Sequence, residues 1–123
     1  MTAIKSYTDI EQSKKLAEIL PLESADMNYW CGTQIRIGGH RTMDKDLDVP
    51  CWSLSALLGV LPKEVEIDGQ RYAPCLFPIQ DKWLLKLWYN SNHTITSPIA
   101  IFSDNPIDAC MTMVEKLHKL NLL

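Results

Sequence analysis

The stretch Trp83-Leu84-Leu85-Lys86-Leu87-Trp88-Tyr89 decides the fold of this chain. Six of its seven side chains are apolar or aromatic, and it contains no glycine or proline. Alternate residues of a strand point to opposite faces, so the four odd-numbered residues share one face and Leu84, Lys86 and Trp88 share the other. Large apolar groups on both faces predict an interior strand that helices cover on at least one side.

Length, net charge and the lack of long apolar runs limit the number of domains and the class of partner that we expect. A chain of 123 residues lies in the common single-domain range, so we expect one globular domain over residues 1–123. The net charge of -3 disfavours a nucleic-acid partner, because phosphate neutralisation needs a basic face. No apolar signal core follows Met1 and no apolar run is long enough to cross a bilayer, so we expect a cytoplasmic protein with no membrane partner.

The metal-ligating residue types form no recognised pattern. The cysteines at 31, 51, 75 and 110 contain no C-x-x-C pair, and we expect them to be small buried side chains. The three histidines are too dispersed for a zinc site. The acidic run Asp44–Asp48 lacks the glycine and the bidentate glutamate of a calcium loop. The sequence therefore predicts no metal and no cofactor.

Helices are well marked at both ends of the chain. Thr8-Asp9-Ile10-Glu11 is typical of a capping box with Thr8 as the cap, and Pro21 ends that helix. Near the other end, Asn105 is suited to cap a helix and Pro106 to occupy its first position. A shorter helix is predicted within Trp52–Leu61 from apolar residues at helical spacing.

Strands are expected between these helices. Residues of Met27–Ile37 alternate with period two, which predicts one half-buried strand, and the polar loop His40–Asp48 follows it. Asp68-Gly69 is the strongest hairpin signal in the chain. The return strand Gln70–Ile79 contains two prolines, so we expect it at a sheet edge or broken into two pieces. The strand predicted over Thr94–Phe102 is interrupted by a proline and is a second edge candidate.

Together these elements predict an α+β fold. We expect an antiparallel sheet of four to five strands, with three helices packed mainly on one face.

Partner-binding candidates come from the aromatic residues and the polar loop. Trp30 and Trp88 fall on strand faces opposite the most regular apolar rows, so an exposed indole there is a natural anchor for a partner. The alternative is that a helix covers that face and both residues belong to the core. His40 and Arg41 begin the loop, where binding residues often lie.

Three blocks of the chain carry a resemblance. Tyr7–Leu16, Trp52–Leu58 and Asp104–Cys110 look like the blocks of small uncharacterised proteins of phages, prophages and mobile elements of gut bacteria. The resemblance covers about a third of the chain and implies a phage-type accessory protein. It carries no known activity and no catalytic residues to transfer.

Three functions remain open. The leading hypothesis is a non-enzymatic binding protein that contacts an unidentified protein partner, or forms a homodimer across an edge strand. The second is a small enzyme with a Cys–His or His–carboxylate pair in a concave pocket. The third is a nucleic-acid-associated accessory protein, which requires Arg36, Arg41, Lys82 and Lys86 to cluster.

Overall fold

The chain forms two compact units, Met1–Val60 and Leu61–Leu123. The structure is a computed structural model that describes residues 5–30, 34–37, 48–89 and 98–123. The predicted α+β class is confirmed, with three α-helices and antiparallel strands. The strands form two sheets, of three and four strands, where the sequence predicted one. Whether the two units together form the single globular domain expected over residues 1–123 depends on how they combine, so that expectation stays a prediction.

The first unit contains a three-stranded antiparallel sheet. Its strands are β1 (Met27–Trp30), β2 (Gln34–Ile37) and β3 (Asp48–Cys51), in the order β2-β1-β3. The single strand predicted over Met27–Ile37 is therefore wrong, because β1 and β2 are antiparallel neighbours with Trp30 opposite Gln34. Period-two alternation is the same on both strands of a hairpin, so the pattern does not reveal the reversal.

Strand β3 was not predicted from the sequence. It lies at an edge of the sheet, with Pro50 opposite Asn28. A proline has no backbone N–H group to donate, and an edge strand tolerates this loss because it has a neighbouring strand on one side only. The polar loop predicted over His40–Asp48 lies outside the described residues up to position 47.

Helix α1 (Ile10–Ile19) begins one residue later than predicted. Its cap is Asp9, which accepts a hydrogen bond from the Gln12 amide at 2.8 Å while the Gln12 side chain accepts from the Asp9 amide at 3.1 Å. The predicted cap, Thr8, is unsuitable because its hydroxyl is buried and bonded elsewhere. The helix ends before Pro21, as predicted, and the short 3-10 helix η1 (Leu22–Ser24) follows.

The core of the first unit lies between α1 and its sheet. Tyr29, Val49 and Cys51 form the buried cluster, and Ile10 packs against it from α1. Helix α2 (Leu54–Val60) is confirmed, and the Ser53 hydroxyl, just before it, accepts from the Ala56 amide at 3.2 Å.

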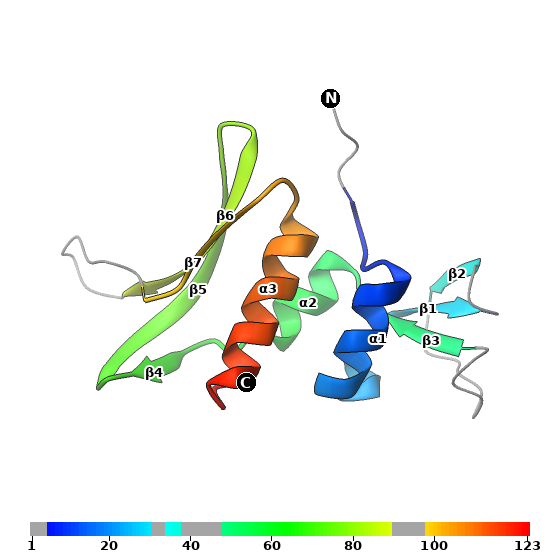
Figure 1. Cartoon of the computed structure of the whole chain (residues 1–123), viewed down its shortest axis with the longest axis horizontal. Helices are drawn as coiled ribbons and strands as arrows, with labels where there is room; N and C mark the ends of the chain where they lie inside the picture. Colours follow the sequence, from blue (N-terminus) through cyan, green and yellow to red (C-terminus); the bar gives the residue numbers. More distant parts are fainter. Residues whose placement is uncertain (1–4, 31–33, 38–47, 90–97) are drawn as a thin grey trace. The chain divides into compact units, whose positions relative to one another are not determined.

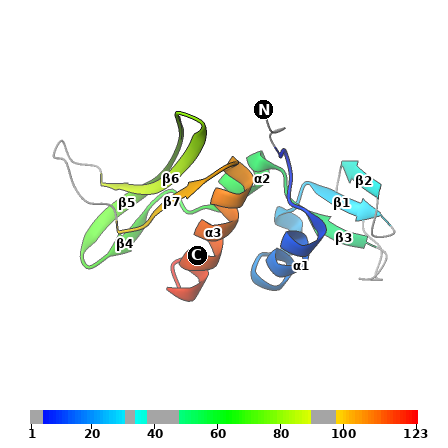
Figure 2. The same ribbon diagram turned by 45° about the horizontal axis from the view of Figure 1, so that its top comes forward.

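The second unit contains a four-stranded antiparallel sheet (Figure 1). Its order is β4-β5-β6-β7, so β6 is an interior strand and β7 an edge strand, as predicted. In Figure 2, β5 and β6 form a long hairpin that extends beyond both outer strands. The strands are β4 (Val65–Ile67), β5 (Gln70–Ile79), β6 (Lys82–Tyr89) and β7 (Ala100–Ser103).

The Asp68-Gly69 turn is confirmed as a tight hairpin turn. Both residues have positive φ angles, 51° and 82°, as this turn requires. Strand β5 is neither broken nor an edge strand, which corrects the sequence prediction. However, β4 pairs only with Gln70–Tyr72, so the segment with Pro74 and Pro78 has no neighbour among the described residues on that side. Backbone groups along a strand point alternately to its two neighbours, so Pro74 and Pro78 have the same backbone orientation as Gln70, which faces β4. The position where each proline lacks an N–H group is therefore on the side that β4 leaves unpaired.

Helix α3 (Pro106–Lys119) covers one face of this sheet (Figure 1). Asn105 caps it, as predicted, by accepting from the Asp108 amide at 2.8 Å. The helix packs on β6 and β7, and its buried stripe meets Leu85 and Leu87, which have no exposed area. The fully buried members of the stripe are Ile107, Ala109, Cys110, Met113, Val114 and Leu117.

Replacing Val114 with Asp tests this core. We expect a loss of at least about 3 kcal/mol in unfolding free energy, because the change buries an unpaired carboxylate. The measurement is urea unfolding followed by circular dichroism. Lys116→Asp, on the exposed side of the same helix, is the control, and it should cost at most about 1 kcal/mol through the helix dipole. Equal losses from both variants would contradict the assignment of this face to the core.

Candidate functional site

The two faces of the four-stranded sheet have different surroundings. Leu85 and Leu87 point toward α3 and are fully buried. Leu84, Lys86 and Trp88 alternate with them and therefore lie on the opposite face, which we call the outer face. Strand register fixes the rest of this face. Its residues are Glu66 of β4, Arg71, Ala73, Cys75, Phe77 and Ile79 of β5, Lys82, Leu84, Lys86 and Trp88 of β6, and Ala100 and Phe102 of β7.

Cross-strand rows organise the outer face. Phe77, Leu84 and Phe102 stand directly opposite one another on three adjacent strands. Leu84 keeps only 6% of its surface exposed because it lies between the two phenyl rings. The residues around it remain open, with exposed fractions of 62% for Phe102 and 47% for Trp88. The outer face is thus a continuous apolar surface with two exposed aromatic side chains.

Lys86 brings a positive charge into this surface. Its Nζ lies 4.4 Å from the centroid of the Trp88 ring and 5.7 Å from that of Phe77. Both distances suit a cation–π interaction, which holds the ammonium over the aromatic rings. Among the described residues no carboxylate pairs with Lys86. The outer face therefore combines aromatic groups with a cation, Lys86, that lies over their rings and can meet an anionic partner group.

Two further cations, Lys82 and Arg71, share the outer face by register but lie near carboxylates. Lys82 Nζ lies 2.6 Å from Asp104 Oδ1, and this hydrogen bond raises the pKa of Lys82. Arg71 makes only a long contact of 4.0 Å with Glu64. Since both pairs are exposed, each contributes little to stability.

The four predicted partner-binding residues have different outcomes. Trp88 is an exposed residue of the outer face. Trp30 is half-buried in the first unit, where the Arg36 guanidinium carbon lies 4.9 Å from the centroid of its ring. His40 and Arg41 lie outside the described residues. The structure thus places the two tryptophans in different sheets, and their role in binding stays a prediction.

Sequence reasoning missed Phe77 and Phe102. The turn at Gln80–Asp81 sets Ile79 opposite Lys82 and so places Phe77 beside Leu84, whereas Phe102 reaches Leu84 through the separate pairing of β7 with β6. Gln80 adopts a positive φ of 56° without being glycine, so the sequence carried no turn signal at this point.

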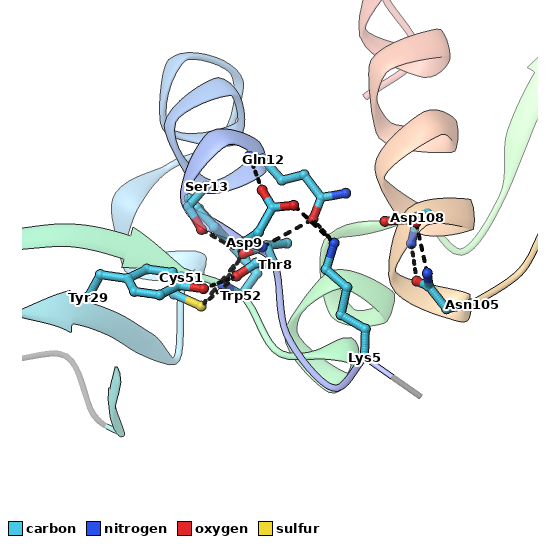
Figure 3. Close-up of polar contacts among 10 residues, drawn as sticks. All are labelled: Lys5, Thr8, Asp9, Gln12, Ser13, Tyr29, Cys51, Trp52, Asn105 and Asp108. Carbon is cyan, nitrogen blue, oxygen red and sulfur yellow. Dashed lines mark hydrogen bonds and ion pairs between the residues drawn. The ribbon is translucent and has the colours of Figure 1, made fainter. Parts of the chain in front are cut away.

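A second candidate is the buried polar cluster around Thr8 in the first unit (Figure 3). Thr8 Oγ1 lies 2.8 Å from Ser13 Oγ and accepts from the Trp52 amide at 3.1 Å. The Tyr29 hydroxyl donates to the Thr8 carbonyl at 2.6 Å, and the Cys51 thiol donates to the same carbonyl at 3.4 Å. These bonds tie the start of α1 to β1 and β3.

The titratable groups of this cluster favour their neutral forms. Burial raises the pKa of the Cys51 thiol, although hydrogen bonds from Thr8 and Ser13 oppose the shift. Burial also raises the pKa of Tyr29. A nucleophilic cysteine needs a stabilised thiolate, which this site does not provide. We therefore assign the Thr8 cluster a structural role.

A shallow depression opens beside the cluster. It has a volume of about 390 Å³ and is lined by Lys5, Ser6, Tyr7, Asp9 and Tyr29. Lys5 Nζ contacts Asp9 Oδ2 at 3.1 Å and Gln12 Oε1 at 2.6 Å, so its charge is engaged within the helix cap. The depression thus presents no pair of groups arranged for acid–base chemistry.

The Cys–His hypothesis finds no support in the described part of the chain. Cys110 is fully buried, and burial raises its pKa to about 12. His118 is exposed in the last turn of α3. The described residues also contain no cluster of three potential metal ligands. His40, His93 and Cys31 lie outside these residues.

Comparison with known protein families, with curated proteins and with solved structures finds no match for this chain. The resemblance to phage-type proteins consequently stays a prediction. Within the described residues, none of the helices has the length and apolarity needed to cross a membrane.

Replacing Thr8 with Val tests the structural role of the cluster. The change keeps the shape but removes the acceptor of the buried Trp52 amide, so we expect a loss of about 1–3 kcal/mol in urea unfolding. Thr112→Val is the matched control. Its hydroxyl only donates to the Asp108 carbonyl of its own helix, at 3.1 Å, and we expect a change below about 0.5 kcal/mol. A neutral Thr8→Val variant would remove the basis for this assignment.

The raised pKa of Cys110 predicts alkaline destabilisation. In the unfolded chain the thiol ionises near its ordinary value of 9.0, whereas in the folded chain it stays protonated to about 12. The associated stability is complete below pH 9 and falls as pH rises toward 12, by up to about 1.4 kcal/mol per pH unit. Urea unfolding at several pH values should show a shallower alkaline loss for Cys110→Ala than for wild type. Thr112→Val, which changes no titratable group, should retain the wild-type slope.

Proposed function

We propose that this protein is a non-enzymatic binding protein whose outer face contacts a protein partner. The observation that carries the proposal is the pair of exposed aromatic residues, Trp88 and Phe102, on one apolar sheet face. Large aromatic side chains lose most by remaining in water and dominate the energetics of protein interfaces. A single exposed aromatic residue needs no explanation, but a continuous surface of this kind is typical of a contact site.

The charge of the outer face indicates the chemistry of the partner. Lys86 is held over Trp88 and Phe77, so little side-chain freedom remains to be lost on binding. A partner that buries the two rings brings its own groups close to the ammonium. We therefore expect an apolar partner surface that includes a carboxylate facing Lys86, because burial without a counter-charge would be costly.

The two alternative functions have weaker support. Phe77, Trp88 and Phe102 also resemble a platform on which nucleic-acid bases stack. Such a platform needs cations along the phosphate path, and Lys82 is engaged by Asp104 in a chain of net charge -3. An enzymatic role with a Cys–His pair would involve His40, His93 or Cys31, which lie outside the described residues. We also propose that this binding protein is a cytoplasmic accessory protein of phage type, and only the sequence supports this part of the proposal.

Affinity capture with matched variants tests this function. Tagged wild type is expressed in its source cells, and captured proteins are quantified by mass spectrometry. We expect Trp88→Ala and Lys86→Glu to lose the same partner, each at a cost of about 2 kcal/mol in binding. Leu120→Ala and Lys63→Glu are the controls, because they change an exposed apolar residue and an exposed lysine away from the outer face.

Two results would count against the proposal. Capture of the same partner by both outer-face variants would show that the contact lies elsewhere. Binding of fluorescein-labelled oligo(dT) by wild type at physiological salt, reduced by Trp88→Ala, would favour the nucleic-acid alternative instead.

A further inference from the structure

The two edges of the four-stranded sheet are protected to different degrees. On the β4 side, Glu66 lies on a strand of three residues, and Pro74 and Pro78 lie on the flank of β5 that β4 leaves uncovered. Charged residues, short strands and prolines all discourage pairing with another strand. Strand β7, Ala100-Ile101-Phe102-Ser103, contains neither a charge nor a proline. Among the described residues, its outer edge is therefore the sheet edge that is left open to pairing.

The hydrogen-bond pattern shows which backbone groups point outward from β7. The Leu87 amide donates to the Ile99 carbonyl at 3.1 Å, so Ile99 and, two residues on, Ile101 face β6. Ala100 and Phe102 alternate with them and direct their N–H and C=O groups to the open edge. No hydrogen bond from the described residues reaches these four groups. Their side chains are both exposed.

We infer that β7 pairs with β7 of a second copy of this chain, in an antiparallel and symmetric dimer. With Ile101 on the two-fold axis, Ala100 of each copy faces Phe102 of the other. Each of these two facing pairs exchanges two backbone hydrogen bonds, which gives four in total. Registers shifted by two residues place Pro98 or Asp104, which lie outside β7, opposite Phe102 or Ala100 of the second copy.

Side-chain size makes this register self-complementary. Ala100 and Phe102 both lie on the outer face, so each phenyl ring packs over the small Ala100 of the second copy. Phe102, 62% exposed in one copy, becomes covered. No charged residue lies on β7, so two acidic chains meet there without opposed like charges. The dimer also joins the two outer faces into one surface. This inference does not depend on the identity of any other partner.

Sedimentation equilibrium of the full chain tests the dimer. We expect wild type to pass from monomer to dimer as its concentration rises to about 200 µM. Ala100→Pro removes an outward N–H group and leaves the bonds to β6 intact, so it should weaken dimerisation at least tenfold. Phe102→Lys should do the same, because it replaces the covered ring with a charge. The matched control is Ile79→Lys, an exposed apolar residue of the same face on β5, which should leave dimerisation unchanged.

Amide hydrogen exchange supplies a readout that needs no variant. In a β7 dimer the Ala100 and Phe102 amides exchange more slowly at high protein concentration than at low concentration. A wild-type monomer throughout the concentration range would overturn the inference. The inference would also be overturned if the Ala100→Pro and Phe102→Lys variants both still formed the dimer, and if hydrogen exchange of the Ala100 and Phe102 amides did not depend on protein concentration. Circular dichroism of each variant separates loss of pairing from loss of fold.

Discussion

The alternation of side chains along β6 is the constraint on which the second unit depends. Leu85 and Leu87 are fully buried beneath α3, and this burial supplies much of the apolar contact between helix and sheet. Because neighbouring residues of a strand point to opposite faces, the same anchoring directs Lys86 and Trp88 to the outer face. The core and the candidate binding surface are therefore set by one strand in one register.

The apolar character of the outer face sets this sheet apart from the common one-sided arrangement. An antiparallel sheet with a single helix layer normally carries polar residues on its open face. Here that face carries Phe77, Leu84, Trp88 and Phe102, and its central lysine is held by aromatic rings. Such residues weaken solubility without stabilising the described core, except for Leu84. Contact with a partner would bury these side chains and remove their apolar surface from water.

Sequence patterns predicted the elements with strong local signals, and missed what depends on distant residues. The Asp68-Gly69 turn, the Asn105 cap and the interior strand β6 follow from local rules. The reversal between β1 and β2 keeps the same alternation, so the pattern predicts a single strand there. The cap of α1 is Asp9 and not Thr8, because Thr8 forms buried hydrogen bonds with Tyr29, Cys51 and Trp52. These partners are distant in the sequence, so no local pattern indicates the bonds. Exposure of Trp88 likewise depends on which face α3 covers.

The two edges of the sheet connect assembly with binding. Prolines on the flank of β5 remove backbone donors there, so within the described part of this sheet an added strand finds unbroken donors and acceptors beside β7. Phe102 belongs both to that edge and to the outer face, next to Leu84. Pairing at β7 thus extends the outer face across a two-fold axis and brings two copies of Lys86 and Trp88 onto one surface. A partner with a repeated or symmetric contact then gains from both copies at once, since the second contact forms without a further loss of translational freedom.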